Sequence, residues 1–193
     1  MADKRTVKTL AAIRKAFSEL IIEQDDVMFT IKEIAAKADI NRKTFYLHFN
    51  SIEDLYEDLE KRTEEKLIAI LDEKNFFSER FSLRLFLDSL LELIETNEPL
   101  YERLLIEDKY KFLFRNVKNK IKEKIVPFFI ADSKSLKAEM ETEYVFSGLI
   151  KLFRVWHKRK DEMGKEEMYE TAYKIVKFGL NGLPQDIPLK ITL

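Results

Sequence analysis

The chain has 193 residues, of which 46% are hydrophobic and 36% charged, with four Gly, four Pro and no Cys. This length suits one domain, or a small domain joined to a larger one, and the composition favours helices over sheets. The lack of cysteine excludes disulfides, thiolate metal sites and cysteine nucleophiles. No apolar run of about 18 residues occurs and the N-terminus lacks a hydrophobic signal core, so we expect a cytoplasmic protein without a membrane span.

The net charge of −1 conceals an uneven distribution along the chain. Residues 1–50 contain nine Lys or Arg and seven Asp or Glu, whereas the remaining 143 residues contain 25 and 28. The N-terminal excess of positive charge is small. It favours an anionic partner for that part of the chain without establishing one.

The N-terminal quarter has the periodicity and caps of short amphipathic helices. Apolar residues recur every three or four positions over 5–23, which predicts a first helix. Thr30 and Glu33 form a capping-box pattern, because the threonine hydroxyl can accept a backbone N–H while the glutamate reaches back. We therefore expect a second helix after Thr30, with Ile34 and Ala35 on its inner face.

Two further caps follow closely. Asn41 is a good N-cap for another short helix, running from Arg42 to about His48. The sequence Asn50-Ser51 is a second cap and predicts a long helix that begins at Ile52.

The rest of the chain also has helical spacing. Asn97-Glu98-Pro99 marks a helix boundary, because proline is tolerated in a first turn, and Pro127 breaks or kinks a later helix. One long helix is expected from Leu136 to about Lys160, and a last one from Lys165 to about Asn181. The fold class is therefore all-α, with about nine helices and no convincing strand.

The two short helices around residue 40 form a helix-turn-helix outline. The first helix must pack, so its inner residues are apolar. The second must lie in a DNA groove, so its start should be polar or basic and its far side apolar. Asn41 to Thr44 fit the exposed end, and Phe45 and Phe49 fit the buried face. We accordingly divide the chain into a DNA-binding domain, 1–50 with its motif at 30–49, and a larger C-terminal domain, 51–193.

The stretch FTIKEIAAKADINRKTFYLHFNSIEDLYEDL, residues 29–59, resembles the DNA-binding segment of the TetR/AcrR-type transcriptional regulators. TFYLHF, residues 44–49, is the most specific part of the resemblance. Two positions depart from the family pattern: Asp39 stands where the family has its turn glycine, and Ile52 where it has a lysine. An aspartate can adopt the left-handed conformation, but less freely than glycine.

The resemblance implies DNA-contacting roles for matching residues. Tyr46 and His48 align with positions that meet phosphates, and Arg42, Lys43 and Thr44 with positions that meet base edges or the DNA backbone. The complete set of candidate DNA contacts is Thr30, Lys32, Asn41, Arg42, Lys43, Thr44, Tyr46 and His48.

The phenylalanine-rich middle of the chain is a candidate effector pocket, as the family usually has one. The aromatic residues expected to line it are Phe86, Tyr101, Tyr110, Phe114 and Phe153. Aromatic residues at helical spacing can equally be ordinary core, so both readings stand.

The last two expected helices have more apolar surface than one helix face in a small domain needs. Paired with their symmetry mates they would form a four-helix dimer interface, which the resemblance also implies. The expected interface residues are Leu149, Phe153, Trp156, Met168, Ala172, Ile175 and Gly179. The alternative is that these side chains form the chain's own core.

Enzymatic readings have little support. The sequence has no P-loop, no glycine-rich dinucleotide motif and no nucleophile elbow, and its two histidines, His48 and His157, lie far apart. We therefore expect no enzyme, no cofactor and no metal. The resemblance predicts a homodimeric repressor that binds double-stranded operator DNA and is released by a small-molecule effector. The rival is a helical binding or protein-interaction module that has lost DNA recognition.

Overall fold

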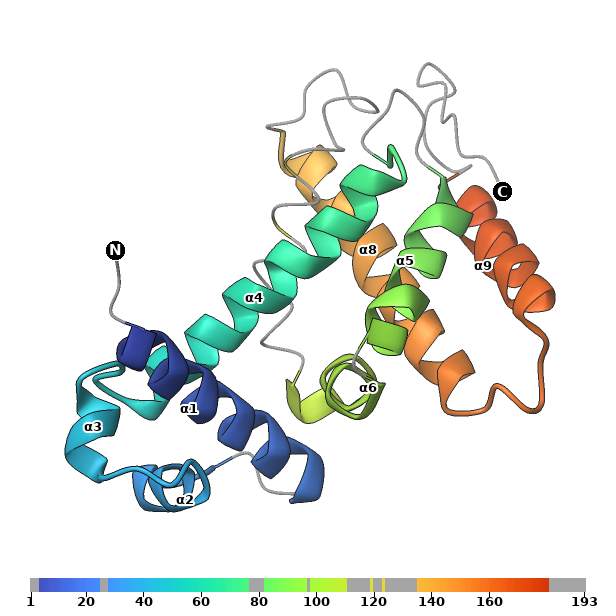
Figure 1. Cartoon of the computed structure of the whole chain (residues 1–193). Coiled ribbons are helices and arrows are strands. Elements are labelled where there is room, and N and C mark those ends of the chain that lie inside the picture. Colours follow the sequence, from blue (N-terminus) through green and yellow to red (C-terminus); the bar gives the residue numbers. More distant parts are fainter. Residues whose placement is uncertain are drawn as a thin grey trace.

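The computed structural model describes residues 4–24, 28–76, 82–96, 98–110, 119, 123 and 135–180. Within these ranges the secondary structure consists of eight helices without a strand, which confirms the all-α fold class. Figure 1 shows a small N-terminal unit of short helices, joined by a long helix to a larger group. The predicted break at Pro127 lies outside the described residues.

The N-terminal unit contains α1 (Lys4–Glu23), α2 (Ile31–Lys37) and α3 (Arg42–Tyr46). Helix α1 buries Phe17 and Ile21 on one face, as its periodicity predicts. Helix α3 is shorter than expected and ends at Tyr46, because the next two residues form a turn.

The predicted caps are present. The Thr30 hydroxyl accepts a hydrogen bond from the Glu33 backbone N–H (3.2 Å), and the Glu33 carboxylate accepts one from the Thr30 N–H (2.8 Å). The Asn41 side chain accepts from the Lys43 N–H at 2.9 Å. Each cap satisfies a donor that has no partner within its helix, so the two short helices begin at defined residues.

The long helix α4 (Ile52–Glu73) begins at the predicted place, with Ser51 as its N-cap. It is joined to α1 by a polar and an aromatic contact. Arg14 Nε donates to Asp58 Oδ2 at 3.0 Å, and the rings of Phe17 and Tyr56 meet edge to face at 4.8 Å. These contacts fix the N-terminal unit to the start of α4.

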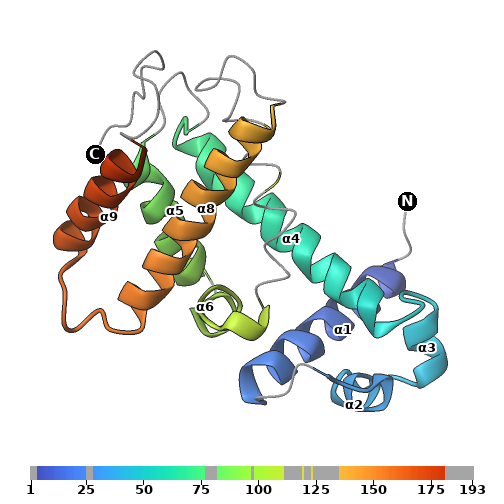
Figure 2. The same ribbon diagram turned by 180° about the vertical axis from the view of Figure 1, so that it is seen from behind.

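The larger group consists of α5 (Leu83–Thr96), α6 (Glu98–Ile106), α8 (Leu136–His157) and α9 (Lys165–Leu180). Helix α6 begins where Asn97-Glu98-Pro99 predicts, and α8 ends three residues before the expected Lys160 because residues 158–162 form turns. From behind, α9 lies at the outer edge of the molecule, and α8 crosses the middle of the larger group in front of α5 (Figure 2). No helix in the described ranges is both long and apolar enough to cross a membrane.

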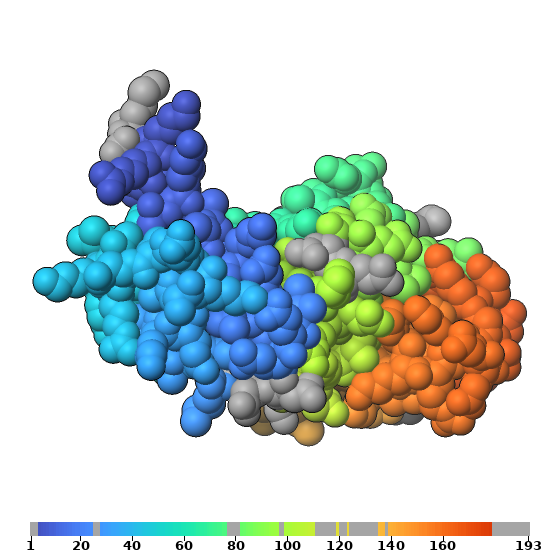
Figure 3. Space-filling view, turned by 60° about the horizontal axis from the view of Figure 1, so that its bottom comes forward, coloured from blue at the N-terminus to red at the C-terminus, as the bar shows by residue number. Residues whose placement is uncertain are grey.

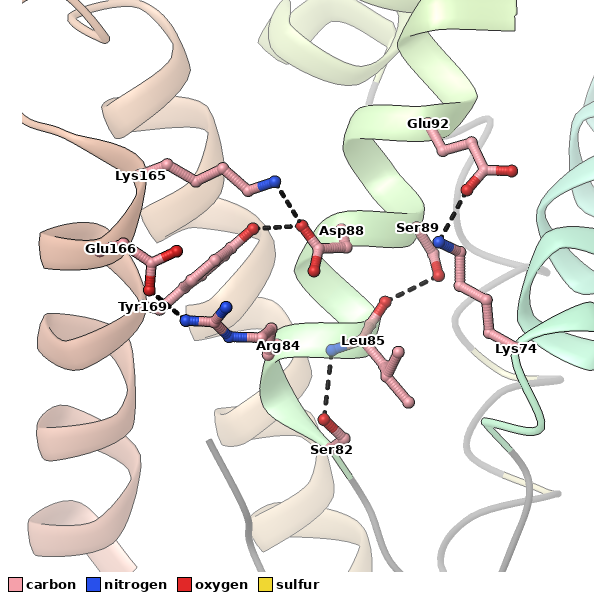
Figure 4. A network of polar contacts seen from close by, with 10 residues as sticks. All are labelled: Lys74, Ser82, Arg84, Leu85, Asp88, Ser89, Glu92, Lys165, Glu166 and Tyr169. Atoms are coloured by element: carbon pink, nitrogen blue, oxygen red, sulfur yellow. Dashed lines mark hydrogen bonds and ion pairs between the residues drawn. The ribbon is translucent and has the colours of Figure 1, made fainter.

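A polar network fastens α9 to α5 (Figure 4). Asp88 of α5 accepts hydrogen bonds from the Tyr169 hydroxyl and from Lys165 Nζ, the latter at 2.7 Å. The Arg84 guanidinium lies over the Tyr169 ring, 4.8 Å from its centroid, and pairs with Glu166. The buried aromatic ring of Tyr169 is thus held by groups from both helices.

Candidate nucleic-acid interface

The helix-turn-helix is built on two buried aromatic residues. Phe45 has no exposed surface and Phe49 only 7%, and their ring centroids lie 5.8 Å apart. From α2, Ile34 and Ala35 are buried in the same unit, and the small alanine allows close packing. The inner side of α3 is therefore fixed by burial, and its other side is left at the surface.

The outer side of α3 is polar and basic. Asn41, Arg42 and Lys43 are exposed, as is 55% of Tyr46. The Tyr46 ring packs edge to face against the buried Phe45 ring, with 5.9 Å between the ring centroids, and this contact orients the Tyr46 ring. Arg42 and Lys43 form no ion pair within the described part of the chain, so nothing there neutralises their charge. Such groups suit phosphate oxygens and base edges.

Most of the remaining predicted contact residues are less exposed, or their hydrogen-bonding groups already have partners. Thr44 and His48 are half-buried, and Lys32 is exposed at the start of α2. The Thr30 hydroxyl also donates to Glu33 Oε2 at 2.6 Å, so both of its hydrogen-bonding functions serve the capping box. This hydrogen bond lowers the pKa of Glu33 and keeps its carboxylate charged. A DNA contact at Thr30 would compete with the cap.

The two departures from the family pattern have structural explanations. Asp39 has φ 53°, so it adopts the left-handed conformation that glycine usually supplies at such a turn. Ile52 is partly buried and packs against the hydrophobic core, so it presents no charge to a phosphate.

Two exposed apolar side chains were not predicted from the sequence. Leu47, directly after α3, is 81% exposed, and Met28, before α2, is 87% exposed. Leu47 lies between Tyr46 and His48. Its position between two candidate DNA contacts could have identified it as a further candidate from the sequence. A large apolar side chain on a DNA-reading surface can contact a thymine methyl group.

The candidate pocket residues are buried, and they come from several helices. Phe86 of α5, Tyr101 of α6, Tyr110 after α6 and Phe153 of α8 are each at most 6% exposed. Phe86 also meets Phe146 of α8 edge to face at 5.7 Å. Phe114 lies outside the described residues. Burial agrees with a pocket wall and with ordinary core, so the effector pocket stays a prediction.

The structure buries four of the seven residues predicted for the dimer interface. Leu149, Phe153, Met168 and Ala172 are each at most 3% exposed in the single chain, so they belong to its own core and present no surface to a second copy. The sequence correctly shows apolar residues at helical spacing here. Helical spacing does not show which apolar face of the helix packs into the chain's own core. Ile175 is 43% exposed and Trp156 partly exposed, while the surroundings of Gly179 are not described.

A different apolar surface lies on the same two helices. On α8 its members are separated by 4, 4 and 11 residues, which places them on one face, and on α9 by three. It consists of Leu136, Met140, Tyr144, Val155, Ile175 and Phe178, which are 43–71% exposed. We call it the α8–α9 stripe. Next to it, a cavity of about 260 Å³ opens between the end of α8 and α9, bordered by Val155 and Trp156.

Comparison with known proteins agrees with this geometry. The family described as "Bacterial regulatory proteins, tetR family" matches residues 13–59, which extend from α1 into α4. YxbF, an uncharacterized HTH-type transcriptional regulator of Bacillus subtilis (strain 168), is 35% identical over 80 residues, or 39% of this chain and 21% of the relative. The matched part therefore spans about a fifth of that curated relative.

Solved structures share the architecture over most of the chain. A TetR transcriptional regulator from Streptococcus agalactiae 2603V has a TM-score of 0.69 at 20% identity, covering 90% of this chain and 96% of that one. FadR from Bacillus subtilis in complex with stearoyl-CoA has a TM-score of 0.55 at 13% identity, covering 91% and 100%. At these identities the likeness shows a common fold. The family match over residues 13–59 shows, in addition, that the helix-turn-helix is similar to the DNA-binding part of the tetR family.

Proposed function

We propose that this protein is a transcriptional regulator that binds double-stranded operator DNA as a homodimer and is released by a small molecule. Residues 1–50 would be its DNA-binding domain and 51–193 its effector-binding and dimerisation domain. The observation that carries the proposal is the division of α3 into two sides. Phe45 and Phe49 are buried, while Arg42, Lys43 and Tyr46 are exposed. The function is one of binding, and no catalytic step is part of it.

The exposed groups suggest how the DNA is held. Lys43 and Arg42 stand at the start of α3, where long cationic side chains can reach base edges or phosphates in a major groove. Tyr46 and His48 follow and would donate to phosphate oxygens, with Asn41, Thr44 and Lys32 at the edges of the contact. Each phosphate neutralised by a cation makes the affinity more dependent on salt.

A dimer follows from the same reading. A helix-turn-helix protein needs two recognition helices, about 34–36 Å apart, to read two half-sites of an operator. The α8–α9 stripe is an apolar surface of the kind that a monomer rarely exposes. We assign it to contact with a second copy, in which two helices from each chain form a four-helix interface.

The effector site is proposed for the buried aromatic residues of the larger helix group. Phe86 of α5, Tyr101 of α6, Tyr110 after α6 and Phe153 of α8 all belong to the same hydrophobic core. The fold neighbour FadR was solved in complex with stearoyl-CoA, a ligand whose acyl chain is apolar. Binding would favour a dimer whose two α3 helices no longer match successive major grooves, and the regulator would act in the cytoplasm.

The test begins with DNA selection. Purified protein is used to enrich binding duplexes from a random pool, and fluorescence anisotropy then measures their affinity at several salt concentrations. We expect an enriched motif with two-fold symmetry. Lys43→Ala should weaken binding and either reduce the salt dependence or relax preference at one base pair. Lys160→Ala is the matched control, since this exposed lysine lies in the turn between α8 and α9, away from α3 (Figure 1).

The rival function gives a different result. If no motif is enriched and wild type and Lys43→Ala bind DNA equally weakly, the protein is a helical binding module without DNA recognition. The similarity to the tetR family would then describe its fold, and not its activity.

A further inference from the structure

Helix α6 lies between the DNA-binding unit and the outer helices. In the space-filling view its yellow-green surface separates the blue N-terminal helices from the orange α8 and α9 (Figure 3). It is only nine residues long, Glu98–Ile106, yet its side chains and its carbonyl end contact elements on both sides. Two arginines make these contacts.

The first arginine reaches from α6 to α1. Arg103 Nη1 lies 2.6, 2.8 and 2.7 Å from the carbonyl oxygens of Ile21, Ile22 and Gln24. These carbonyls stand at the end of α1, where a helix has acceptors without internal partners and a partial negative charge. Arg103 Nε donates to Glu107 Oε1 at 2.9 Å, which holds the guanidinium in place. Arg103 thus caps a helix of the DNA-binding unit from the other domain.

The second arginine binds the same last turn of α6 from the other side. Arg154 of α8 is only 7% exposed, and its Nε donates to the carbonyl oxygen of Leu105, in the last turn of α6. Its Nη1 lies 3.3 Å from Asp108 Oδ1, just beyond the helix. Lys151 of α8 pairs with the same carboxylate at 3.4 Å. The last turn of α6 is therefore tied both to α8, through Arg154, and to α1, through Arg103.

We propose that Arg103 and Arg154 are positioning residues that form a two-arginine relay, through which the positions of α8 and α1 are coupled. The relay deepens the proposed function and rests on it, since it is the route by which events in the larger helix group reach the DNA-binding unit. Hydrogen bonds weaken steeply with small displacements, so a shift of α6 by one or two ångströms breaks one set of contacts. Because both arginines bind at the last turn of α6, a shift of this turn with α8 also displaces the contacts between Arg103 and α1.

Position between two sites does not by itself demonstrate coupling, because both arginines could serve stability alone. The two roles differ in one measurable respect. If DNA binding at α3 and the state of α8 are coupled, the coupling is reciprocal, so DNA must alter α6 and α8 as well. A merely structural contact lowers the melting temperature and transmits nothing.

The experiment measures hydrogen–deuterium exchange of the full-length protein with and without a duplex selected by the wild type. Peptides covering 98–106 and 136–157 report on α6 and α8. In the wild type, saturating duplex should change exchange in both. In Arg103→Gln, also saturated with duplex, neither α6 nor α8 should respond. In Arg154→Gln, α6 should respond and α8 should not.

Controls separate the relay from general destabilisation. Arg84→Gln removes an arginine that links α5 with α9 and not α6 with α1 or α8, so α6 and α8 of this variant should respond as in wild type. Because Arg154 is buried, Arg154→Lys is measured beside Arg154→Gln. A lysine keeps the charge but lacks the planar guanidinium that binds the Leu105 carbonyl and Asp108 at the same time. Duplex should therefore not change exchange in α8 of this variant either. Melting temperatures identify any variant that does not fold.

The outcomes are distinct. If the wild type selects a duplex but its α6 and α8 do not respond, or if Arg103→Gln still transmits the response, the relay is wrong and the regulator function stands. The same holds if Arg154→Lys leaves the response of α8 intact. If no duplex is selected, the proposed function fails and the relay fails with it.

Discussion

The hydroxyl of Tyr169 donates a hydrogen bond to Asp88, which ties α9 to α5 across the larger helix group (Figure 4). Lys165 approaches the same carboxylate at 2.7 Å, and its ammonium also lies 5.6 Å from the centre of the Tyr169 ring. The residues are far apart in sequence and meet only in the fold. The contact matters for function because α9 carries part of the surface that we assign to dimerisation.

Replacing Asp88 should therefore loosen α9. We expect Asp88→Asn to reduce the free energy of unfolding by about 1–3 kcal/mol near neutral pH, because hydrogen bonds to a charged group lose their charged partner. Chemical denaturation measures the change. Asp161→Asn, an exposed carboxylate in the turn before α9, is the matched control and should be neutral. Equal stability of the two variants would show that the network contributes little.

The same network predicts a pH dependence. Burial alone would raise the pKa of Asp88, but hydrogen bonds from Lys165 and Tyr169 outweigh it and hold the pKa below its usual value of 3.8. Burial, reinforced by Asp88, raises the pKa of Tyr169 from 10.0 to about 12. The carboxylate's contribution to stability is present above pH 3.8 and lost as pH falls through the lowered pKa. The phenol's contribution is present below pH 10.0 and lost as pH rises toward about 12.

The difference in stability between wild type and Asp88→Asn should therefore be constant near neutral pH and shrink in strong acid. Thermal unfolding followed by circular dichroism over this range checks it. A difference that grows in acid would assign the effect to something other than the Asp88 carboxylate.

Two adjacent residues of α3 should give opposite results. Phe45→Ala removes a fully buried ring and should cost roughly 3–5 kcal/mol of folding stability, with DNA binding lost only as a consequence. Tyr46→Phe removes one hydroxyl at the surface and should leave stability nearly unchanged. It should weaken binding to every duplex by about 1.5–3 kcal/mol, the value of a hydrogen bond to a charged acceptor.

Melting temperatures and affinities for selected and random duplexes decide between the two sides of α3. Normal DNA affinity in both Tyr46→Phe and Lys43→Ala would remove the main support for α3 as the reading helix.

Leu47 should act on sequence preference alone. Its side chain is 81% exposed, so Leu47→Ala removes little buried surface and should not change the melting temperature measurably. If Leu47 packs on a thymine methyl group, the variant should lose preference at one A·T pair while keeping its affinity for unrelated DNA. Repeating the DNA selection with the variant reveals this, and an unchanged motif would show that Leu47 does not face a base.

The α8–α9 stripe should hold two copies together. Ile175→Glu and Phe178→Glu place carboxylates on exposed apolar positions of α9, so the monomer should fold normally and fail to dimerise. Sedimentation velocity measures the oligomeric state. Val7→Glu adds a carboxylate at another exposed apolar position, on α1, and should sediment like wild type. A wild type that sediments as a monomer at micromolar concentration would refute the dimer.

The sequence alone determined the local structure of the N-terminal quarter. Thr30, Asn41 and Ser51 cap helices at the residues expected of them, because a cap involves only neighbours along the chain. The all-α class followed from composition and spacing. The assignment of Phe45 and Phe49 to the buried side of α3 and of the turn after it also followed, since one side must be buried and apolar residues suit it.

Tertiary structure decided which apolar face of α8 and α9 turns inward. Leu149, Met168 and Ala172 satisfy the same periodicity as a surface stripe, but they pack into the chain's own core and leave Val155 and Phe178 outside. Periodicity marks a helix face without naming its neighbour, because the neighbour comes from a distant segment. The Arg103 cap on α1 and the Tyr169–Asp88 contact each join residues about eighty positions apart. A charged residue in a sequence full of charges gives no sign of such a partner until folding brings the two together.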